Sequence, residues 1–360
     1  MVESRLIGPV RVVGAGLLGT SIGLGLCARG IDVILADASP TNLSIAVDYG
    51  AGRAARPDDA PQLIVVCVPP DVTAEIVARE LAAFPQAIVT DVASVKLAPL
   101  QELRMMGADV SRYIGGHPLA GRERGGPLSG RADLFVGRPW VVAAHDAISY
   151  QQATAIDDLI LDLGATLVEM SPEEHDRGVA LISHVPQVVS TIMARRLTDA
   201  PGSALNLAGQ GLRDVTRVAA SDPDLWVQIL GANAEPVRDI LLAYRDDLDR
   251  FIDALADPAA PGARRKVAEE LTGGNAGVAR LPGNHGQDRR YASFIVMIDD
   301  RPGQIAKLLH EIGELNVNME DLRLEHSPGA QIGLAEISVL PEAVARLTEE
   351  LAARGWRIAG

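Results

Sequence analysis

A glycine-rich turn near the start of the chain constrains the fold more than any other feature. An apolar run over Val10–Val13 predicts a buried strand, the next letters, GAGLLG, have the spacing G-x-G-x-x-G, and Thr20–Ala28 has a helical pattern. Strand, turn and helix in this order are typical of dinucleotide-binding α/β domains. Gly14 permits the turn, Gly16 lets a pyrophosphate approach the backbone, and Gly19 lets the helix pack on the strand. The predicted phosphate site, at the positive end of the helix, comprises Gly14, Gly16, Leu17, Leu18 and Gly19.

The next two strands complete the predicted nucleotide site. The second, Asp32–Ala36, ends at Asp37, whose carboxylate suits a ribose 2′-hydroxyl, and no arginine follows directly to favour a 2′-phosphate. We therefore expect NAD rather than NADP as the cofactor. The third, Leu63–Val68, places Val68 and Pro69 at the strand end that lines the ligand crevice. The alternative is a glycine turn in an α/β protein that binds no nucleotide.

The hydrophobic pattern divides the chain into a sheet domain and a helical domain. Alternating strands and helices predict a Rossmann-type parallel sheet with right-handed crossovers over residues 1–170. At Ser171 the letters SPEEHD predict a capped helix start, and helical periodicity without a strand continues to about residue 256. We expect an all-α substrate and dimerisation domain over residues 171–256, because helices with this much apolar surface favour a homodimer.

The remaining chain predicts a connector and a small third domain. Residues 257–290 are rich in Pro, Gly and Ala and predict a linker or extended arm, apart from a helical piece at Arg264–Leu271. Residues 291–360 follow the order βαββαβ, which is typical of a ferredoxin-like sandwich.

Charge and composition exclude several classes of protein. A net charge of −14 argues against a nucleic-acid surface. The sequence contains no apolar run of membrane-spanning length and no signal peptide, so we expect a cytoplasmic enzyme without a membrane partner. The two cysteines, Cys27 and Cys67, lie in apolar runs and predict reduced core residues, and no metal site is expected.

Two residues of the sheet domain are candidates for acid–base chemistry. His117 lies in GGHPLAG, which we interpret as a loop after a short strand, where an imidazole can take a hydroxyl proton as a hydride leaves. Ser94 follows the preceding strand, where its hydroxyl can fix the imidazole tautomer or contact the substrate. For Ser94 the alternative role is a helix N-cap.

The helical domain offers candidate anion-binding groups. Arg213 and Arg217 in GLRDVTR are four residues apart on one helix face, and two guanidinium groups suit a dicarboxylate. His184 in ISHVPQ is a candidate third donor, and Trp226 is a candidate core residue. The alternative is that both arginines form only surface ion pairs.

These motifs, taken in chain order, resemble the prephenate and arogenate dehydrogenases of tyrosine biosynthesis. The matching segments are GAGLLGTS, TDVASVK, GGHPLAGRERGG, LISHVPQ, GLRDVTR followed by SDPDLW, and LPGNHG. The C-terminal segment DDRPGQIAKLLHEIGELNVNMEDL resembles an ACT domain, a small-molecule regulatory module.

The resemblance implies a reaction and a role for each site residue. NAD takes a hydride from C4 of a cyclohexadienol ring, the ring carboxylate leaves as carbon dioxide, and a phenol forms. His117 accepts the C4 hydroxyl proton, Ser94 hydrogen-bonds the hydroxyl or the imidazole, and Arg217 binds the ring carboxylate. Further implied roles are electrostatic assistance by Arg213, contact with the substrate side chain by His184, and gating of the site by Glu123.

The substrate stays open between two related molecules. Gln187 stands where some prephenate-using relatives carry His. Because an amide oxygen accepts from an ammonium group, arogenate is the alternative to prephenate. Other classes considered are a non-catalytic NAD-sensing protein and a β-hydroxyacid dehydrogenase, whose usual Lys base has no counterpart in helix Val179–Leu197.

The ACT resemblance implies an amino-acid effector, with tyrosine favoured by pathway logic. The implied effector site lies at Asn316 and Asn318, in the loop after the first helix of that segment, with Gly303 nearby. The alternative is a dimerisation module without a ligand.

Overall fold

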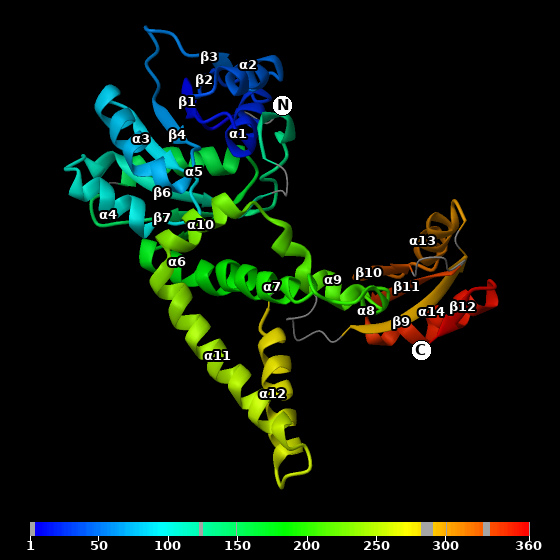
Figure 1. Cartoon of the computed structure of the whole chain (residues 1–360). Helices are drawn as coiled ribbons and strands as arrows, with labels where there is room; N and C mark the ends of the chain where they lie inside the picture. Colours follow the sequence, from blue (N-terminus) through cyan, green and yellow to red (C-terminus); the bar gives the residue numbers. More distant parts are fainter. Residues whose placement is uncertain are drawn as a thin grey trace. The chain divides into compact units, whose positions relative to one another are not determined.

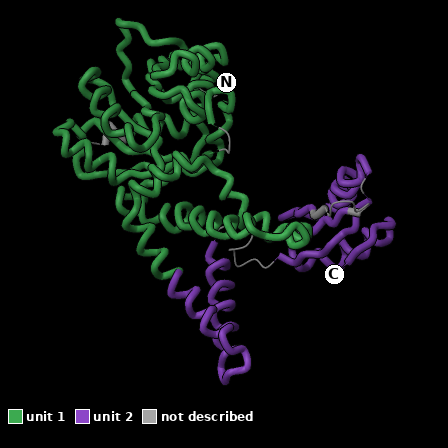
Figure 2. Tube along the Cα trace, viewed as in Figure 1, with its two compact units in different colours: residues 1–244 green, residues 245–360 purple. Residues whose placement is uncertain are grey.

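A computed structural model describes residues 4–121, 125–148, 150–281, 291–299, 301–326 and 332–359. Glu123, most of LPGNHG and the turn expected at 327–330 lie outside these residues. The chain divides into two compact units, residues 1–244 and 245–360, and the boundary falls inside helix α11 (Ala234–Ala256; Figures 1 and 2).

An eight-stranded sheet is the centre of the first unit. Its strand order is β3-β2-β1-β4-β5-β6-β7-β8, and β1 to β6 are parallel. The order reverses between β1 and β4, which is where doubly wound sheets bind their ligands. The strands are β1 (Val10–Val13), β2 (Val33–Ala36), β3 (Arg53–Ala54), β4 (Leu63–Val66), β5 (Ile88–Asp91), β6 (Tyr113–Pro118), β7 (Pro139–Ala143) and β8 (Thr166–Met170).

The prediction that all strands are parallel is wrong, because the last two strands run opposite to the first six. β7 runs antiparallel to β6, with His117 opposite Val141, and β8 is parallel to β7. Parallel neighbours need a long crossover, usually a helix. In the described part of the β6–β7 connection, the helical structure is the single 3₁₀ turn η2 (Pro127–Ser129), so β7 returns antiparallel.

Helices cover both faces of this sheet, and each face has its own apolar core. One core includes Ile22, Leu26 and Ile156, and the other includes Val77 and Leu103. The first face carries α1 (Leu17–Cys27), α2 (Pro40–Asp48) and α5 (Tyr150–Asp162); the second carries α3 (Pro70–Ala83) and α4 (Leu97–Met105), which precedes the 3₁₀ turn η1 (Val110–Arg112). Helix α1 begins earlier than predicted, because Gly16 is its N-cap.

The segment after β8 is helical throughout, as predicted. Ser171 forms a capping box with Glu174, and the chain continues through a π-helical turn, η3, into α7. The pattern predicted one helix over 226–255, but Asn233 leaves helical geometry and separates α10 from α11. The elements are α6 (Pro172–Val179), η3 (Ala180–His184), α7 (Val185–Arg195), α8 (Gly202–Leu205), α9 (Gln210–Thr216), η4 (Arg217–Ala220), α10 (Pro223–Ala232) and α11 (Ala234–Ala256).

In the second unit, the predicted linker is partly helical, whereas the predicted βαββαβ order is present. Helix α12 (Ala263–Val278) occupies half of the stretch interpreted as an extended arm. After it come β9 (Ala292–Asp299), α13 (Gln304–Glu314), β10 (Asp321–His326), β11 (Ile332–Val339), α14 (Pro341–Ala353) and β12 (Arg357–Ala359). These strands form an antiparallel sheet in the order β10-β11-β9-β12, with a core of its own that includes Val296, Leu308 and Ile337.

Within the described ranges, no helix has the length and apolarity needed to cross a membrane.

Candidate active site

The glycine turn has the geometry that phosphate binding requires. Gly14 has a φ of +102°, and a Cβ there would lie 2.2 Å from the Cys67 carbonyl oxygen. A Cβ at Gly19 would lie 1.8 Å from the Gly14 oxygen, whereas a Cβ at Gly16 would meet nothing within 4 Å. Two of the glycines are therefore required by close packing, and the third leaves open space at the N-terminus of α1. The first-turn N–H groups there lack partners inside the helix and suit an anion.

A cavity of about 670 Å³ extends from this turn across the carboxyl ends of β1, β2 and β4. Asp37 is fixed at its edge, because its two oxygens accept the N–H groups of Ala15 and Ser39, each at 2.6 Å. Val68 and Pro69 line the cavity, as predicted. Arg79 of α3 also lines it, and the sequence reading missed this residue because it is distant from Asp37 along the chain. The residues present therefore fit a dinucleotide.

His117 lies inside β6 rather than in the loop that we predicted. It is near the carboxyl end of the strand, and its side chain is half-buried. Its Nδ1 atom is 2.8 Å from Nε2 of His175, and the two rings meet edge to face. Desolvation, and then the neighbouring His175, Lys96 and His184, lower the pKa of His117 well below its usual value. The imidazole is therefore neutral at pH 7 and ready to accept a proton.

His175 and Asp176, which the sequence reading treated only as part of a helix start, complete a buried relay behind His117. Nδ1 of His175 is 2.7 Å from Oδ1 of Asp176. That carboxylate also accepts the N–H groups of Lys96 at 2.8 Å and Leu97 at 3.0 Å. A histidine followed by an aspartate does not by itself indicate a functional site in a sequence. Only the packing of α6 against the sheet domain places this pair behind β6.

Lys96 anchors the same region from the sheet side. Its side chain is fully buried, and its ammonium group binds Asp91 and donates to the Gly116 carbonyl at 2.7 Å. Tyr113 donates its hydroxyl hydrogen to the other Asp91 oxygen at 2.6 Å. Desolvation lowers the pKa of Lys96, whereas the charge of Asp91 raises it. The cluster fixes the backbone next to His117, and its signal in the sequence was the lysine that ends TDVASVK.

His184 is held in the opposite way to His117. The Asn233 amide nitrogen donates to the Asp176 carbonyl at 2.7 Å and lies 3.1 Å from Nδ1 of His184. Because that nitrogen carries two hydrogens, Nδ1 of His184 accepts and its Nε2 carries the hydrogen. Burial lowers the pKa of His184 to about 4, so the ring is neutral. Trp226 packs edge to face against it and is only partly buried.

The two candidate arginines lie near the end of α9. Arg213 lies within the helix and Arg217 begins the turn η4, and both side chains are exposed. Both elements pack against α7, which carries Gln187. Gln187 is buried, and the Ser221 hydroxyl lies 3.5 Å from its side-chain oxygen.

The candidate residues of the sheet domain share one edge. Ser94 follows β5 and His117 lies near the carboxyl end of β6, and these strands are parallel neighbours. The charge of His184 contributes to the lowered pKa of His117, so those two rings lie within electrostatic range of each other. The arrangement supports acid–base chemistry beside a nucleotide cavity. Across the residues that the structure describes, no cluster of potential metal ligands occurs.

The implied effector residues do not form one site within a single chain. Gly303 is the N-cap of α13, whereas Asn316 and Asn318 follow its other end, so the 11-residue helix separates them by about 16 Å. The expectation that Gly303 lies near the two asparagines is therefore wrong within one chain.

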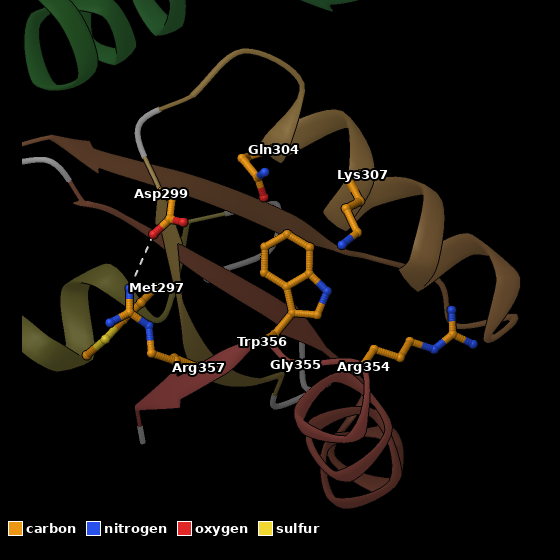
Figure 3. A pocket seen from close by; sticks show the side chains of 8 residues that line it. All are labelled: Met297, Asp299, Gln304, Lys307, Arg354, Gly355, Trp356 and Arg357. Carbon is orange, nitrogen blue, oxygen red and sulfur yellow. Dashed lines mark hydrogen bonds and ion pairs between the residues drawn. The ribbon is translucent and has the colours of Figure 1, made fainter.

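A pocket of about 220 Å³ lies at the Gly303 end of α13 (Figure 3). Trp356 stands in the middle of it, with Lys307 over its ring and Arg357 paired with Asp299.

Family comparisons match most of the first unit and extend into the second. Residues 22–169 match the family model described as prephenate dehydrogenase, nucleotide-binding domain, and residues 171–269 match prephenate dehydrogenase, dimerization domain. The chain belongs to the prephenate dehydrogenase family. The resemblance seen in the motifs is thereby confirmed, as is the expectation of an oxidoreductase. The dimerization match extends beyond residue 256 and includes part of α12.

Individual relatives agree with the family assignment. The probable prephenate dehydrogenase NovF of Streptomyces niveus is 35% identical over 356 residues, which is 96% of this chain and 98% of the relative. The cyclohexadienyl dehydrogenase of Zymomonas mobilis is 30% identical, over 69% of this chain and 88% of its own length.

Two solved structures share the fold over about three quarters of this chain. The prephenate dehydrogenase of Aquifex aeolicus, in complex with hydroxyphenyl propionate and NAD⁺, has a TM-score of 0.67 and 25% identity, and 98% of it is covered. The Synechocystis arogenate dehydrogenase has a TM-score of 0.63 and 28% identity, and 99% of it is covered.

Proposed function

We propose that this protein oxidises and decarboxylates prephenate with NAD, giving 4-hydroxyphenylpyruvate. The observation that carries the proposal is the neutral His117, held by His175 at the edge of the sheet that also forms the dinucleotide cavity. NAD supplies the hydride acceptor. A neutral imidazole supplies the base, which a non-catalytic nucleotide sensor does not need.

The chain's own residues position the substrate and move one proton. His117 accepts the C4 hydroxyl proton as the hydride leaves C4, and Ser94 hydrogen-bonds the same hydroxyl. Arg217 binds the ring carboxylate, with Arg213 assisting, until the carboxylate leaves as carbon dioxide and its electron pair enters the aromatic ring. The resulting phenolate oxygen takes the proton back from the His117 imidazolium, which restores the neutral base. His184 presents its Nε2 hydrogen to the side-chain end of the substrate. The gain of aromaticity drives the reaction, so the main task of the site is orientation.

Arogenate is the second candidate, and Gln187 favours it. Among the residues that the structure describes, the contact of the buried amide oxygen is a long one, with the Ser221 hydroxyl at 3.5 Å, which leaves capacity to accept from the ammonium group of arogenate. A solved structure of similar fold is named an arogenate dehydrogenase.

An assay of the purified protein with NAD and each substrate, following reduced cofactor, separates the two candidates. Faster turnover with prephenate supports the first and faster turnover with arogenate the second. If neither substrate leads to reduction of NAD, both candidate functions are rejected.

The proposed assembly is a homodimer formed through the helical domain. An apolar groove of about 380 Å³ lies along α7, α10 and α11, and its lining includes Val188, Leu230, Val237 and Leu242. A water-exposed groove of this kind favours a protein partner. The matched dimerization family model covers the same helices.

The proposed role of the C-terminal sandwich is regulatory, as an ACT domain that binds tyrosine. The strand order and the separate core of this unit support an independent module. Because Gly303 and Asn316 lie at opposite ends of α13, a shared effector site needs residues from two chains. Calorimetry with tyrosine, phenylalanine and tryptophan tests the proposal; absence of heat with all three favours a dimerisation module without a ligand.

A further inference from the structure

The donor and the acceptor of each hydrogen bond behind His117 can be assigned, beginning at Asp176. Its carboxylate accepts from two backbone N–H groups, those of Lys96 and Leu97, which can only donate. Both carboxylate oxygens are therefore hydrogen-bond acceptors. The ring nitrogen of His175 that faces Oδ1 at 2.7 Å must therefore carry the hydrogen. When the His175 ring carries one hydrogen, that hydrogen is on Nδ1 and Nε2 is bare.

The hydrogen placement on His175 also determines the hydrogen placement on His117. The bare Nε2 of His175 lies 2.8 Å from Nδ1 of His117, so the hydrogen between them belongs to His117. A neutral imidazole has one hydrogen, and with that hydrogen on Nδ1 the Nε2 atom of His117 is an unprotonated acceptor. The opposite tautomer would place a hydrogen on Nε2 and remove its ability to take a proton from a substrate hydroxyl.

We infer that His175 and Asp176 are positioning residues that hold His117 in the tautomer with a bare, proton-accepting Nε2. The inference deepens the proposed function and rests on it for the role of that nitrogen. The groups that act electrostatically on His117 are His175 from α6, Lys96 from the segment before α4, and His184 from η3. None of these three supplies a carboxylate, so Asp176 orients His117 only through the intervening ring.

The direct test is ¹⁵N NMR of histidine-labelled enzyme, with the His117 resonances identified by their loss in His117→Asn. We expect wild-type protein near pH 7 to show His117 protonated at Nδ1 and bare at Nε2. A hydrogen on Nε2 of wild-type His117 overturns the inference. This readout needs no turnover, so it holds even when the proposed substrate is wrong.

Two substitutions of Asp176 separate tautomer control from a structural role. Asp176→Asn can keep its oxygen at the Oδ1 position, where it still accepts from Lys96 and His175, while its NH₂ group opposes the Leu97 N–H. Asp176→Ala loses the acceptor altogether. Both lower the melting temperature. We expect kcat of the Asn variant to stay within about tenfold of wild type, and kcat of the Ala variant to fall about 10²-fold at similar KM.

Asp162→Ala is the matched control. Asp162 is also a buried carboxylate that accepts backbone N–H groups, here from Arg5 and Leu6, but it is outside the relay. We expect the Asp162→Ala variant to be less stable than wild type and to have an unchanged kcat. Equal losses of kcat in the Asn and Ala variants of Asp176, or wild-type kcat in the Ala variant, contradict the inference. Wild-type protein that is inactive with both substrates contradicts the proposed function instead.

Discussion

At the scale of single residues, the candidate site holds two neutral histidines with opposite hydrogen placement. His117 receives its hydrogen bond partner from α6 and presents an acceptor, whereas Asn233 holds His184 so that it presents a donor. Both rings have lowered pKa values, mainly because they are removed from water. One base and one donor at neutral pH suit proton removal from a hydroxyl beside a polar side chain.

Replacement of His117 tests the base. We expect His117→Asn to bind NAD as wild type does and to lose turnover by about 10²-fold or more, because the amide cannot accept the proton. Steady-state kinetics with fluorescence titration of the cofactor measures both quantities. Turnover close to wild type would exclude His117 as the base.

Replacement of Arg217 tests the carboxylate contact. We expect Arg217→Ala to raise KM for the substrate by about tenfold or more, because a charged bidentate contact is lost. Arg195→Ala, which removes another exposed arginine of the helical domain, is the matched control and should leave KM unchanged. An unchanged KM in Arg217→Ala would count against this role.

At the scale of elements, the carboxyl ends of β1, β2 and β4 determine where a dinucleotide binds. The turn between β1 and α1 supplies N–H groups, and the residue after β2 supplies a carboxylate whose position two backbone donors fix. Arg79 of α3 faces the same cavity and carries the opposite charge. We therefore expect Asp37 to favour a ribose hydroxyl and Arg79 to favour a 2′-phosphate.

Removal of Asp37 should shift this cofactor preference. We expect Asp37→Ala to weaken NAD binding by about tenfold and to improve the relative affinity for NADP, because the carboxylate that repels a 2′-phosphate is gone while Arg79 remains. Titration with both cofactors measures the ratio. Asp48→Ala, an exposed aspartate of neighbouring α2, serves as the control, and an unchanged NAD/NADP ratio in the Asp37 variant would refute the assignment.

At the scale of the whole molecule, buried neutral histidines link stability to pH. The folded-state pKa of His184 is about 4, and that of His117 is also lowered, whereas both are near 6.5 in the unfolded chain. The unfolded chain therefore binds more protons between about pH 4 and 6.5. Stability contributed by the neutral rings is full above pH 6.5 and declines as the pH falls toward 4.

Denaturant titrations from pH 4 to 8 test this link. We expect His184→Gln to show a smaller loss of unfolding free energy between pH 6.5 and 4 than wild type. His310→Gln, which replaces an exposed histidine of α13, should show the wild-type slope. The same slope in all three proteins would contradict the argument.

The apolar groove of the helical domain predicts the assembly. We expect light scattering to give twice the chain mass of 38.0 kDa, and Leu242→Glu to shift the protein toward monomer because it places a charge in the groove. Met105→Glu, at an exposed apolar position on α4, should leave the mass unchanged. A monomeric wild type would reject the dimer.

Features that depend on local spacing could be predicted from the amino-acid sequence. The glycine turn, Asp37 at the end of β2, the capped start of α6 and the βαββαβ order all follow from short patterns whose geometry neighbouring residues control. The candidate base His117 and the protein family could also be predicted from the sequence, because several motifs in a fixed order are specific even when each motif alone is weak.

The surroundings of those residues depend on the three-dimensional packing of the chain. The antiparallel return of β7, the break at Asn233, and the presence of Arg79 in the cavity that Asp37 also lines depend on contacts between distant segments. The relay through His175 and Asp176 exists because α6 packs against the sheet domain and brings residue 175 to residue 117. A hydrogen-bond direction needs donors and acceptors in three dimensions, and no periodicity along the chain encodes it.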